Sequence, residues 1–274
     1  MRRLSLQLIA EDSQMIRRML LVLSAACALA IGVAIGSSRA SVSAVVQAAG
    51  KCNALPSEAA LKGFLSAAPG IVAPPLGGTV GGLFNGTRMW GAVVNRDGEL
   101  CAYTTNQADP AQVWPGNQAI AKAKAYTANA FSLDSFVLST ARLYTFTQPG
   151  HSLWSLGQSN LFNTSFLAAP GAQGGINQIA GGQIFFGGGV PLYNASGSIV
   201  GGVGVSGDTS CADHEIAKRV RDLAGLNPPS GPLTDDIVYS GFNPPADLVF
   251  THPKCLNTYR NGTPIGTESP SSGY

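Results

Sequence analysis

Three side chains that can bind a ligand or a metal ion follow one another at helical spacing. His214, Lys218 and Arg221 stand at i, i+4 and i+7, so on a helix they share one face. An imidazole nitrogen can ligate a metal, and the two cations can bind the carboxylates of a ligand. The same face could instead be solvated or contact another subunit, and the sequence leaves these interpretations open.

A second candidate metal ligand lies in a long irregular stretch, residues 151–175. His151 opens this stretch after Pro149 and Gly150, and Trp154 and Phe162 follow. Aromatic side chains around a histidine are suited to covering a planar, metal-containing ligand. Long segments without regular structure are often functional or lie at interfaces. Simple packing of the loop is the alternative.

A glycine triplet precedes a short apolar run. Gly187, Gly188 and Gly189 could direct backbone N–H groups at an anionic ligand. The surrounding residues fit neither the dinucleotide-binding nor the phosphate-loop pattern. Tight turns packed against a helix are the alternative, so we treat the triplet as a candidate ligand contact only.

Several charged residues are expected to have structural roles. Asp208, Asp213 and Glu215 cluster at the start of the helix that carries His214, where the helix dipole favours carboxylates. Capping accounts for them, and a general acid–base or metal-binding role is the alternative. Lys122 and Lys124 point to different faces of an alanine-rich helix, and we expect both to be solvated.

The elements that must position these residues follow from periodicity and turn signals. A hairpin turn is indicated by Asp97-Gly98, and Ser210 can cap the helix that follows it. Gly201, Gly202 and Gly204 would weaken an ordinary strand, so they imply close approach by another backbone or by a ligand. In chain order we expect a helix over 57–67, strands over 88–94 and 99–105, a helix over 118–131, a helical piece within 136–146, a strand over 198–205 and a helix over 211–224.

The N-terminus and the cysteines indicate export. Arginines precede an apolar run and then small residues, which predicts a signal peptide over 1–40 with cleavage near 40–44; an uncleaved anchor is the alternative. The four cysteines beyond this segment favour two disulfides, for which three pairings are possible. Our working pairing is Cys52–Cys101 and Cys211–Cys255, which would tie each terminus to the domain. We therefore expect a periplasmic or secreted protein, attached to a membrane only if the signal segment is retained.

Charge excludes one class of function. The chain has 17 basic and 15 acidic residues, and much of the basic excess lies in the predicted signal peptide. The mature chain is close to neutral and has no basic patch, so nucleic acid is not an expected partner.

The pattern GGGVPLYNASGSIVGGVGVSGDTSCADHEIA over residues 187–217 resembles the GlcG/HbpS group of haem-binding and haem-degrading proteins. The resemblance extends to the hairpin over 90–103 and the helix over 118–131. It implies an α/β (α+β) fold: one domain over 41–226, with an antiparallel sheet of about five strands flanked by helices. Residues 227–274 would form a C-terminal extension packed on the domain.

The resemblance also implies non-covalent binding of haem or a related tetrapyrrole, and assembly into a homo-oligomer. We expect sequestration of haem or assistance in its degradation, with the iron held by His214 or His151 and the haem propionates by Lys218 and Arg221. Two other functions stay open: a small-molecule enzyme or accessory protein of an exported oxidation pathway, with Asp213 in its site, and a ligand-free oligomeric interaction module.

Overall fold

A computed structural model describes residues 51–73, 75–167, 174–239 and 250–267, which belong to the compact unit Lys51–Tyr274. The predicted signal peptide over 1–40 and its cleavage site lie outside the described residues. Among the described residues, none of the helices is both long enough and apolar enough to cross a membrane.

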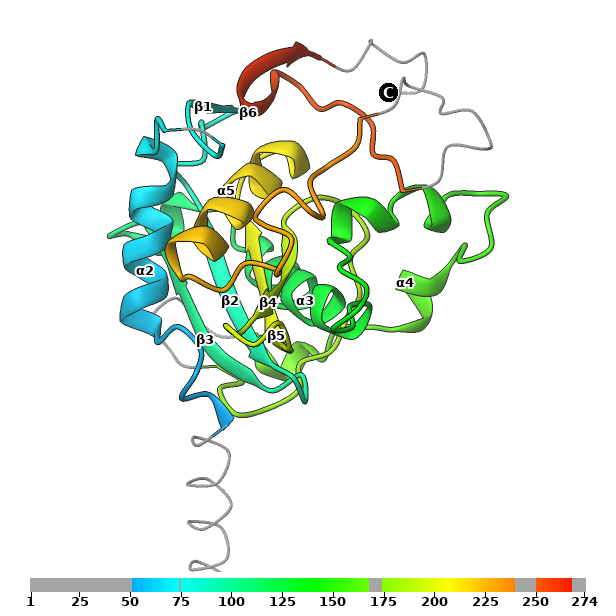
Figure 1. The fold of residues 1–274 in the computed structure, drawn as a ribbon. Helices are drawn as coiled ribbons and strands as arrows, with labels where there is room; N and C mark the ends of the chain where they lie inside the picture. The colour runs from blue at the N-terminus through cyan, green and yellow to red at the C-terminus, as the bar shows by residue number, and fades with distance from the viewer. Residues whose placement is uncertain (1–50, 74, 168–173, 240–249, 268–274) are drawn as a thin grey trace, which may run out of the picture. The chain divides into compact units, whose positions relative to one another are not determined.

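Within the described residues, the main sheet has four antiparallel strands in the order β3-β2-β5-β4 (Figure 1). The predicted hairpin is present, as β2 pairs directly with β3. The predicted strand over 198–205 is β5, and it lies at the centre of the sheet beside β2 and β4. These strands are β2 (Trp90–Asn95), β3 (Leu100–Thr105), β4 (Gly189–Tyr193) and β5 (Ile199–Ser206).

Helices cover both faces of this sheet. Helix α3 (Asn117–Ala130) packs on one face, and α2 (Glu58–Ala67) and α5 (Ser210–Leu223) pack on the other. Alternate residues of β2 point to opposite faces, so Val93 joins the core beneath α2 and α5 whereas Ala92 joins the core beneath α3. The fold is therefore the predicted α/β arrangement, an antiparallel sheet flanked by helices.

The glycines of β5 let helix α3 lie directly on the sheet. A side chain at Gly204 would meet the carbonyl oxygen of Ala121 and the backbone nitrogen of Ala125. A side chain at Gly202 would meet the carbonyl oxygen of Ala125. The predicted close approach to this strand is thus confirmed, and the approaching group is the backbone of α3.

The remaining elements connect or cover these layers. Strand β1 (Thr79–Gly81) pairs with β6 (Thr258–Gly266) in a separate two-stranded sheet, so the described strands form sheets of four and two rather than one of about five. The predicted helical piece within 136–146 consists of short 3-10 turns. The short helices are α4 (Leu156–Ser159) and the 3-10 helices Ala68–Gly70, Pro110–Gln112, Thr140–Leu143, Thr145–Thr147 and Thr164–Phe166.

Two cross-links confirm the predicted cysteine pairing. Cys52 is joined to Cys101, with Cα atoms 5.5 Å apart, and Cys211 to Cys255, with Cα atoms 5.9 Å apart. The first ties the start of the described chain to β3, and the second ties α5 to the segment before β6.

The cap of α5 differs from the prediction. Thr209, rather than Ser210, is the N-cap, and its hydroxyl accepts a hydrogen bond from the backbone N–H of Ala212. Ser210 is instead the first residue of the helix. Both hydroxyl residues are suitable caps, and the backbone path into the helix decides between them.

We expect Gly204→Ala to destabilise the protein by about 1–3 kcal/mol, because the added methyl group would push α3 away from β5. Gly63→Ala is the matched control, since Gly63 lies in α2 with open space around its Cα. That change should leave stability unchanged or raise it by up to about 1 kcal/mol. Urea unfolding of both variants tests this, and equal stabilities would contradict it.

Candidate functional site

The three residues on the predicted ligand-binding face of α5 are buried. His214, Lys218 and Arg221 have no solvent exposure. They contact the C-terminal segment, by which we mean the described residues 227–239 and 250–267. The alternative of a solvated face is therefore wrong, because this segment packs over α5.

Asp236 is the centre of the charged network beneath the C-terminal segment. Its Oδ1 accepts a hydrogen bond from Lys218 Nζ at 2.5 Å, and its Oδ2 accepts from Arg260 Nε at 3.0 Å and Asn261 Nδ2 at 3.2 Å. His214 Nε2 lies 3.7 Å from Oδ1. Burial opposes ionisation of this carboxyl, but the adjacent His214 and Lys218 together hold the pKa of Asp236 well below its usual range. Asp236 is therefore the anion around which the segment is anchored.

Arg221 is also paired inside the fold. Its Nη1 and Nη2 donate to the two carboxylate oxygens of Asp235 at 3.0 and 2.6 Å, in a bidentate arrangement. The carbonyls of Pro191 and Pro232 accept further hydrogen bonds from the same guanidinium. A ligand carboxylate reaches Arg221 only by displacing the C-terminal segment and this aspartate. The assignment of His214, Lys218 and Arg221 to a ligand stays a prediction.

The glycine triplet packs between α3 and α5. The N–H of Gly187 donates to His252 Nε2 at 3.3 Å, and the N–H of Gly189 donates to Thr140 Oγ1 at 2.9 Å. A side chain at Gly188 would meet the backbone of β5. These contacts support the packing interpretation of the triplet, and ligand contact by Gly187, Gly188 and Gly189 stays a prediction.

The expectation that Lys124 is solvated is wrong. Its Nζ is fully buried and donates to Asp213 Oδ2 at 2.7 Å and to the carbonyl of Val205 at 3.1 Å. Burial lowers the pKa of Lys124 and raises that of Asp213 to about 6. Oδ1 of Asp213 accepts the N–H groups of Gly207 and Asp208, so this carboxylate caps the entry to α5 and joins it to α3.

Lys122 is buried as well, but its amine bonds to backbone carbonyls rather than to a carboxylate. Its Nζ donates to the carbonyls of Phe166 at 2.7 Å and Gly174 at 3.0 Å, and it lies 4.0 Å from the centre of the Tyr103 ring. Burial lowers the pKa of this amine to about 8. Lys122 thus fastens the irregular stretch to α3, and its expected solvation is also wrong.

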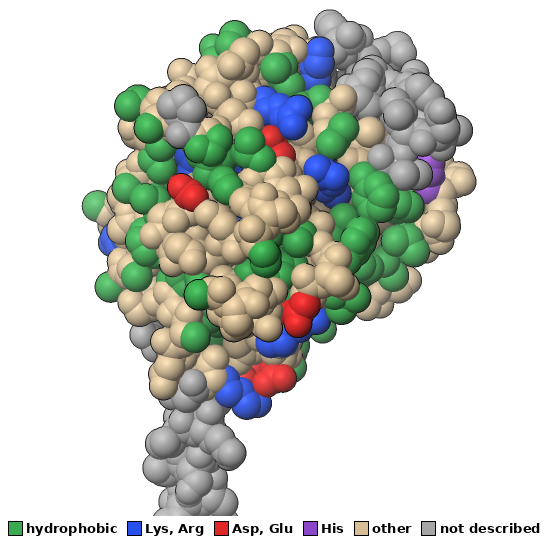
Figure 2. All heavy atoms as spheres, in the orientation of Figure 1, with side chains coloured by type: hydrophobic (Ala, Val, Ile, Leu, Met, Phe, Trp, Pro, Cys, Tyr) green, Lys and Arg blue, Asp and Glu red, His purple; other side chains and the backbone are tan. Residues whose placement is uncertain are grey.

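The irregular aromatic stretch forms one wall of a pocket. The cavity has a volume of about 480 Å³, within the range of small-molecule sites. Figure 2 shows hydrophobic side chains gathered on the side of the molecule where α4 lies in Figure 1. The lining residues come from three short segments: Tyr144, Thr147, Gln148, Trp154, Gly157, Gln158, Leu161, Gln183, Ile184, Phe185 and Phe186.

A second wall of this pocket, residues 183–186, is held by specific contacts. The N–H of Ile184 donates to Thr127 Oγ1 of α3 at 3.0 Å, and the carbonyl of Phe186 accepts from Thr140 Oγ1 at 2.7 Å. Phe185 packs edge-to-face on Phe131. Gln183 Oε1 is buried without a hydrogen-bond partner, so a ligand donor can satisfy it. The wall is preorganised and carries one unsatisfied polar group.

His151 lies near the pocket without lining it. The residue is half-buried, and its carbonyl accepts a hydrogen bond from the N–H of Trp154, which does line the pocket. Phe162 packs elsewhere, against Gly182. The stretch singled out from the sequence therefore supplies part of the pocket lining, and no signal in the sequence indicates that Tyr144 and residues 183–186 supply the rest.

We expect Lys218→Met to destabilise the protein by about 3–5 kcal/mol, because Asp236 and Glu215 would lose their buried partner. Lys51→Met is the matched control. It removes an ion pair with Asp97 whose side chains are 50% and 56% exposed. That loss should cost at most about 1 kcal/mol. Denaturant unfolding measures both, and similar losses would contradict the prediction.

Acid is expected to destabilise the fold through His214. Burial lowers its pKa, and the charge of Lys218 adds to this effect against the opposing influence of Asp236. The unfolded chain takes up the proton near pH 6.5, so below that pH it binds more protons than the folded chain. The free energy of unfolding therefore falls as the pH decreases. His252, whose pKa is lowered to about 3 by burial, acts in the same direction.

Replacing His214 with Gln should therefore make the free energy of unfolding less dependent on pH over about pH 7 to 5. Urea unfolding at several pH values measures this slope. The same series on His151→Gln is the control, because it removes a histidine outside the network. A slope equal to that of the wild-type protein in His214→Gln would contradict the prediction.

Comparison with protein families gives one match. The family described as haem degrading protein HbpS-like matches residues 84–222. These residues include every residue that lines the pocket, whereas Asp235, Asp236 and Cys255 lie beyond them. No curated protein matches the chain.

Three solved structures are similar to this chain. Klebsiella pneumoniae protein ORFY is 24% identical over 51% of this chain and 76% of its own, with a TM-score of 0.36. A PduOC:haem complex is 23% identical over 52% and 81%, with a TM-score of 0.38. HbpS is 22% identical over 50% and 73%, with a TM-score of 0.33. By the match over residues 84–222, the chain belongs to the HbpS-like family.

Proposed function

We propose that this chain binds haem in the aromatic pocket, and that it sequesters haem or assists in its degradation. The observation that carries the proposal is the cavity of about 480 Å³, which lies wholly within the residues matched by the haem-degrading family. A haem site needs a dry, apolar slot with a few polar groups that orient the ligand.

The pocket walls suit the flat faces of a porphyrin. Trp154 and Leu161 line the pocket from residues 154–161, and Phe185 and Phe186 line it from residues 183–186. Phe185 is almost completely buried, whereas Trp154 is 53% exposed in the described structure. Trp154 therefore has surface that a ligand can bury, while Phe185 forms part of the fixed wall.

Polar groups in the lining match the remaining parts of the ligand. Tyr144 carries an oxygen of a type that ligates haem iron in some proteins. The side-chain NH2 groups of Gln148, Gln158 and Gln183 can donate hydrogen bonds to propionate carboxylates, and that of Gln148 also donates to the carbonyl of Tyr144. The residues fit non-covalent haem, with the propionates held by amides rather than by cations.

Bound haem would supply the redox chemistry of its iron. The part of the chain itself is to exclude water and hold the ring. Phe185 and Phe186 would exclude water. Their backbone is held in place by hydrogen bonds to Thr127 and Thr140. The amides of Gln148, Gln158 and Gln183 in the lining would hold the ring by hydrogen bonds to its polar groups.

The two predicted histidines are retained as secondary candidates for the iron ligand. His151 belongs to the turn that carries Trp154, so a small movement of that turn brings it to the pocket. His214, with Lys218 and Arg221, requires displacement of the C-terminal segment. We rank the pocket first because it needs no such opening.

We further propose that the protein is periplasmic or secreted and forms a homo-oligomer. The two disulfides support an oxidising compartment. Exposed apolar side chains support self-association, among them Leu161 at 77% and Ile179 at 49% exposure. Size-exclusion chromatography with light scattering measures the assembly.

Haem titration of the purified chain, followed by visible absorption, tests the function. We expect a saturable shift of the Soret band in the wild-type protein and binding weaker by about 5- to 150-fold in Trp154→Ala, since stacking of a planar ring on an aromatic side chain contributes about 1–3 kcal/mol. Trp114→Ala is the matched control, because Trp114 is similarly exposed, at 47%, and does not line the pocket.

Two outcomes separate the site from the function. No Soret shift at micromolar haem in the wild-type protein would overturn haem binding itself. A normal shift that Trp154→Ala leaves unchanged would overturn the pocket assignment, and His151→Ala and His214→Gln would then identify the ligand. Faster loss of the Soret band under ascorbate or peroxide than for free haem would support degradation over sequestration.

A further inference from the structure

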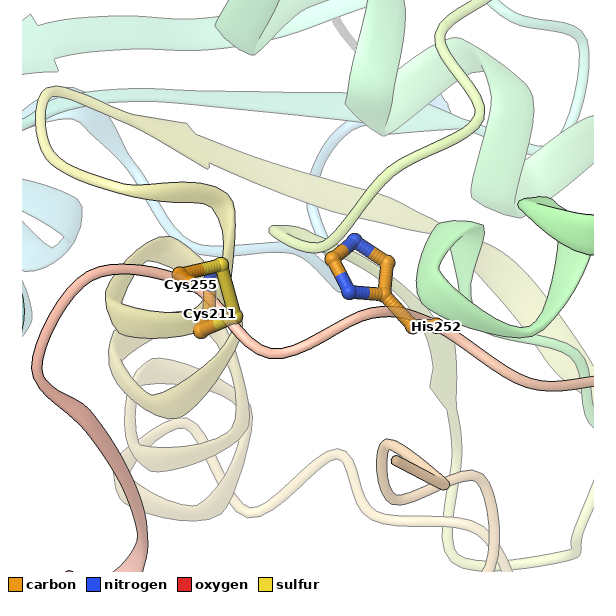
Figure 3. Close-up of side chains that lie close together, drawn as sticks. All are labelled: Cys211, His252 and Cys255. Atoms are coloured by element: carbon orange, nitrogen blue, oxygen red, sulfur yellow. A yellow bond between two sulfur atoms is a disulfide. The ribbon is translucent and has the colours of Figure 1, made fainter. Parts of the chain in front are cut away.

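A second group of metal-ligand atoms lies next to the pocket lining, since the ring centres of His252 and Tyr144 are 5.0 Å apart. The sulfur atoms of Cys211 and Cys255 and a ring nitrogen of His252 all lie within 4.8 Å of one another, and all three residues are buried. Figure 3 shows the disulfide at the start of α5 and the His252 ring beside it, on the same segment as Cys255. Two sulfurs and an imidazole are a ligand set that Zn²⁺ and similar ions favour.

The tautomer of His252 suits a metal ligand. Its Nδ1 lies 2.6 Å from the carbonyl of Pro253, so Nδ1 carries the proton and donates it. Nε2 is then an acceptor, in agreement with the N–H of Gly187 that points at it from 3.3 Å. Metal-ligating histidines commonly donate their other ring N–H to a backbone carbonyl in this way, which orients the ring.

The surroundings of Cys255 Sγ favour negative charge, whereas Cys211 Sγ lies 3.7 Å from the carbonyl oxygen of Pro253. Cys211 lies in the first turn of α5, and its backbone N–H donates to Cys255 Sγ at 3.2 Å. The hydroxyl of Ser210 lies 3.3 Å from the same sulfur and 3.4 Å from His252 Nε2. Backbone N–H groups at the start of a helix stabilise thiolates, and the hydroxyl stands where a further oxygen ligand can lie.

We propose that reduction of the Cys211–Cys255 disulfide converts this cluster into a binding site for a thiophilic divalent ion such as Zn²⁺, with Cys211, Cys255 and His252 as ligands. A thiol reductant breaks the S–S bond by exchange: two reductant thiols become a disulfide, and each cysteine sulfur gains a proton. The metal ion then displaces these two protons to solvent and accepts the lone pair of His252 Nε2. Ser210 or a solvent molecule fills the fourth position.

The cluster would link the same two parts of the chain in both redox states. The disulfide joins the start of α5 to the segment that anchors β6, and the metal ion would join the same two points. The C-terminal segment would therefore stay over the buried network of α5 when the disulfide is reduced. This inference does not depend on haem binding, because none of the three ligands lines the aromatic pocket.

The test uses the full chain with Cys52→Ser and Cys101→Ser, which removes the other disulfide and leaves the proposed ligands intact. The protein is reduced with a phosphine, desalted without oxygen and titrated with Co²⁺, and thiolate-to-cobalt charge-transfer absorption is recorded. We expect one Co²⁺ per reduced chain, displaced by Zn²⁺, and no such absorption from the oxidised chain. His252→Gln should weaken binding at least about tenfold, since loss of even an outer-shell partner costs about 10–100-fold.

Three results would overturn the proposal: no charge-transfer absorption from the reduced chain, equal absorption from the oxidised chain, or unchanged affinity in His252→Gln. If the Cys52→Ser, Cys101→Ser protein does not fold, the wild-type chain is compared with Cys211→Ser, Cys255→Ser. The signal of the reduced wild-type chain should then be lost in that variant, and its retention would place the metal at the other cysteine pair instead.

Discussion

The structure depends on the direct backbone contact between α3 and β5. Because Gly202 and Gly204 carry no side chains, the helix lies close enough for Lys124 to reach the far end of the sheet. There its Nζ pairs with Asp213 of α5, so a single buried ion pair joins the helices on the two faces. Removing either partner would leave an uncompensated charge in the core, which makes this contact costly to break.

The same contact shapes the pocket. Lys124 Nζ lies 4.8 Å from the centre of the Phe186 ring, at the end of the pocket wall. Thr127, one turn further along α3, accepts the N–H of Ile184 from the same wall. The wall then passes into the tightly packed triplet around Gly188, where there is no space for a side chain. The position of α3 thus determines both the rigid core and the open site.

Buried ion pairs hold the C-terminal segment against α5. Asp235 and Asp236 pair with Arg221 and Lys218, so a strongly charged helix face becomes an internal one. Buried ion pairs add little net stability compared with apolar packing, but they accept one geometry only. They therefore specify where the segment lies, and the disulfide at Cys255 reinforces that position.

The sequence by itself determined the helices α2, α3 and α5, the paired hairpin and the close approach at β5, because these follow from short-range periodicity and turn chemistry. Cysteine number indicated two disulfides, but the tertiary structure decides among the three possible pairings. It also singled out the aromatic stretch that forms part of the pocket lining. Tertiary structure alone decided the fate of the charged residues: Lys124 and Lys218 have the spacing of solvated side chains, yet both are buried. Helical spacing shows which residues share a face but not what covers that face. Here folding brings Asp213 to Lys124 and Asp236 to Lys218, and each aspartate comes from a different element than its lysine.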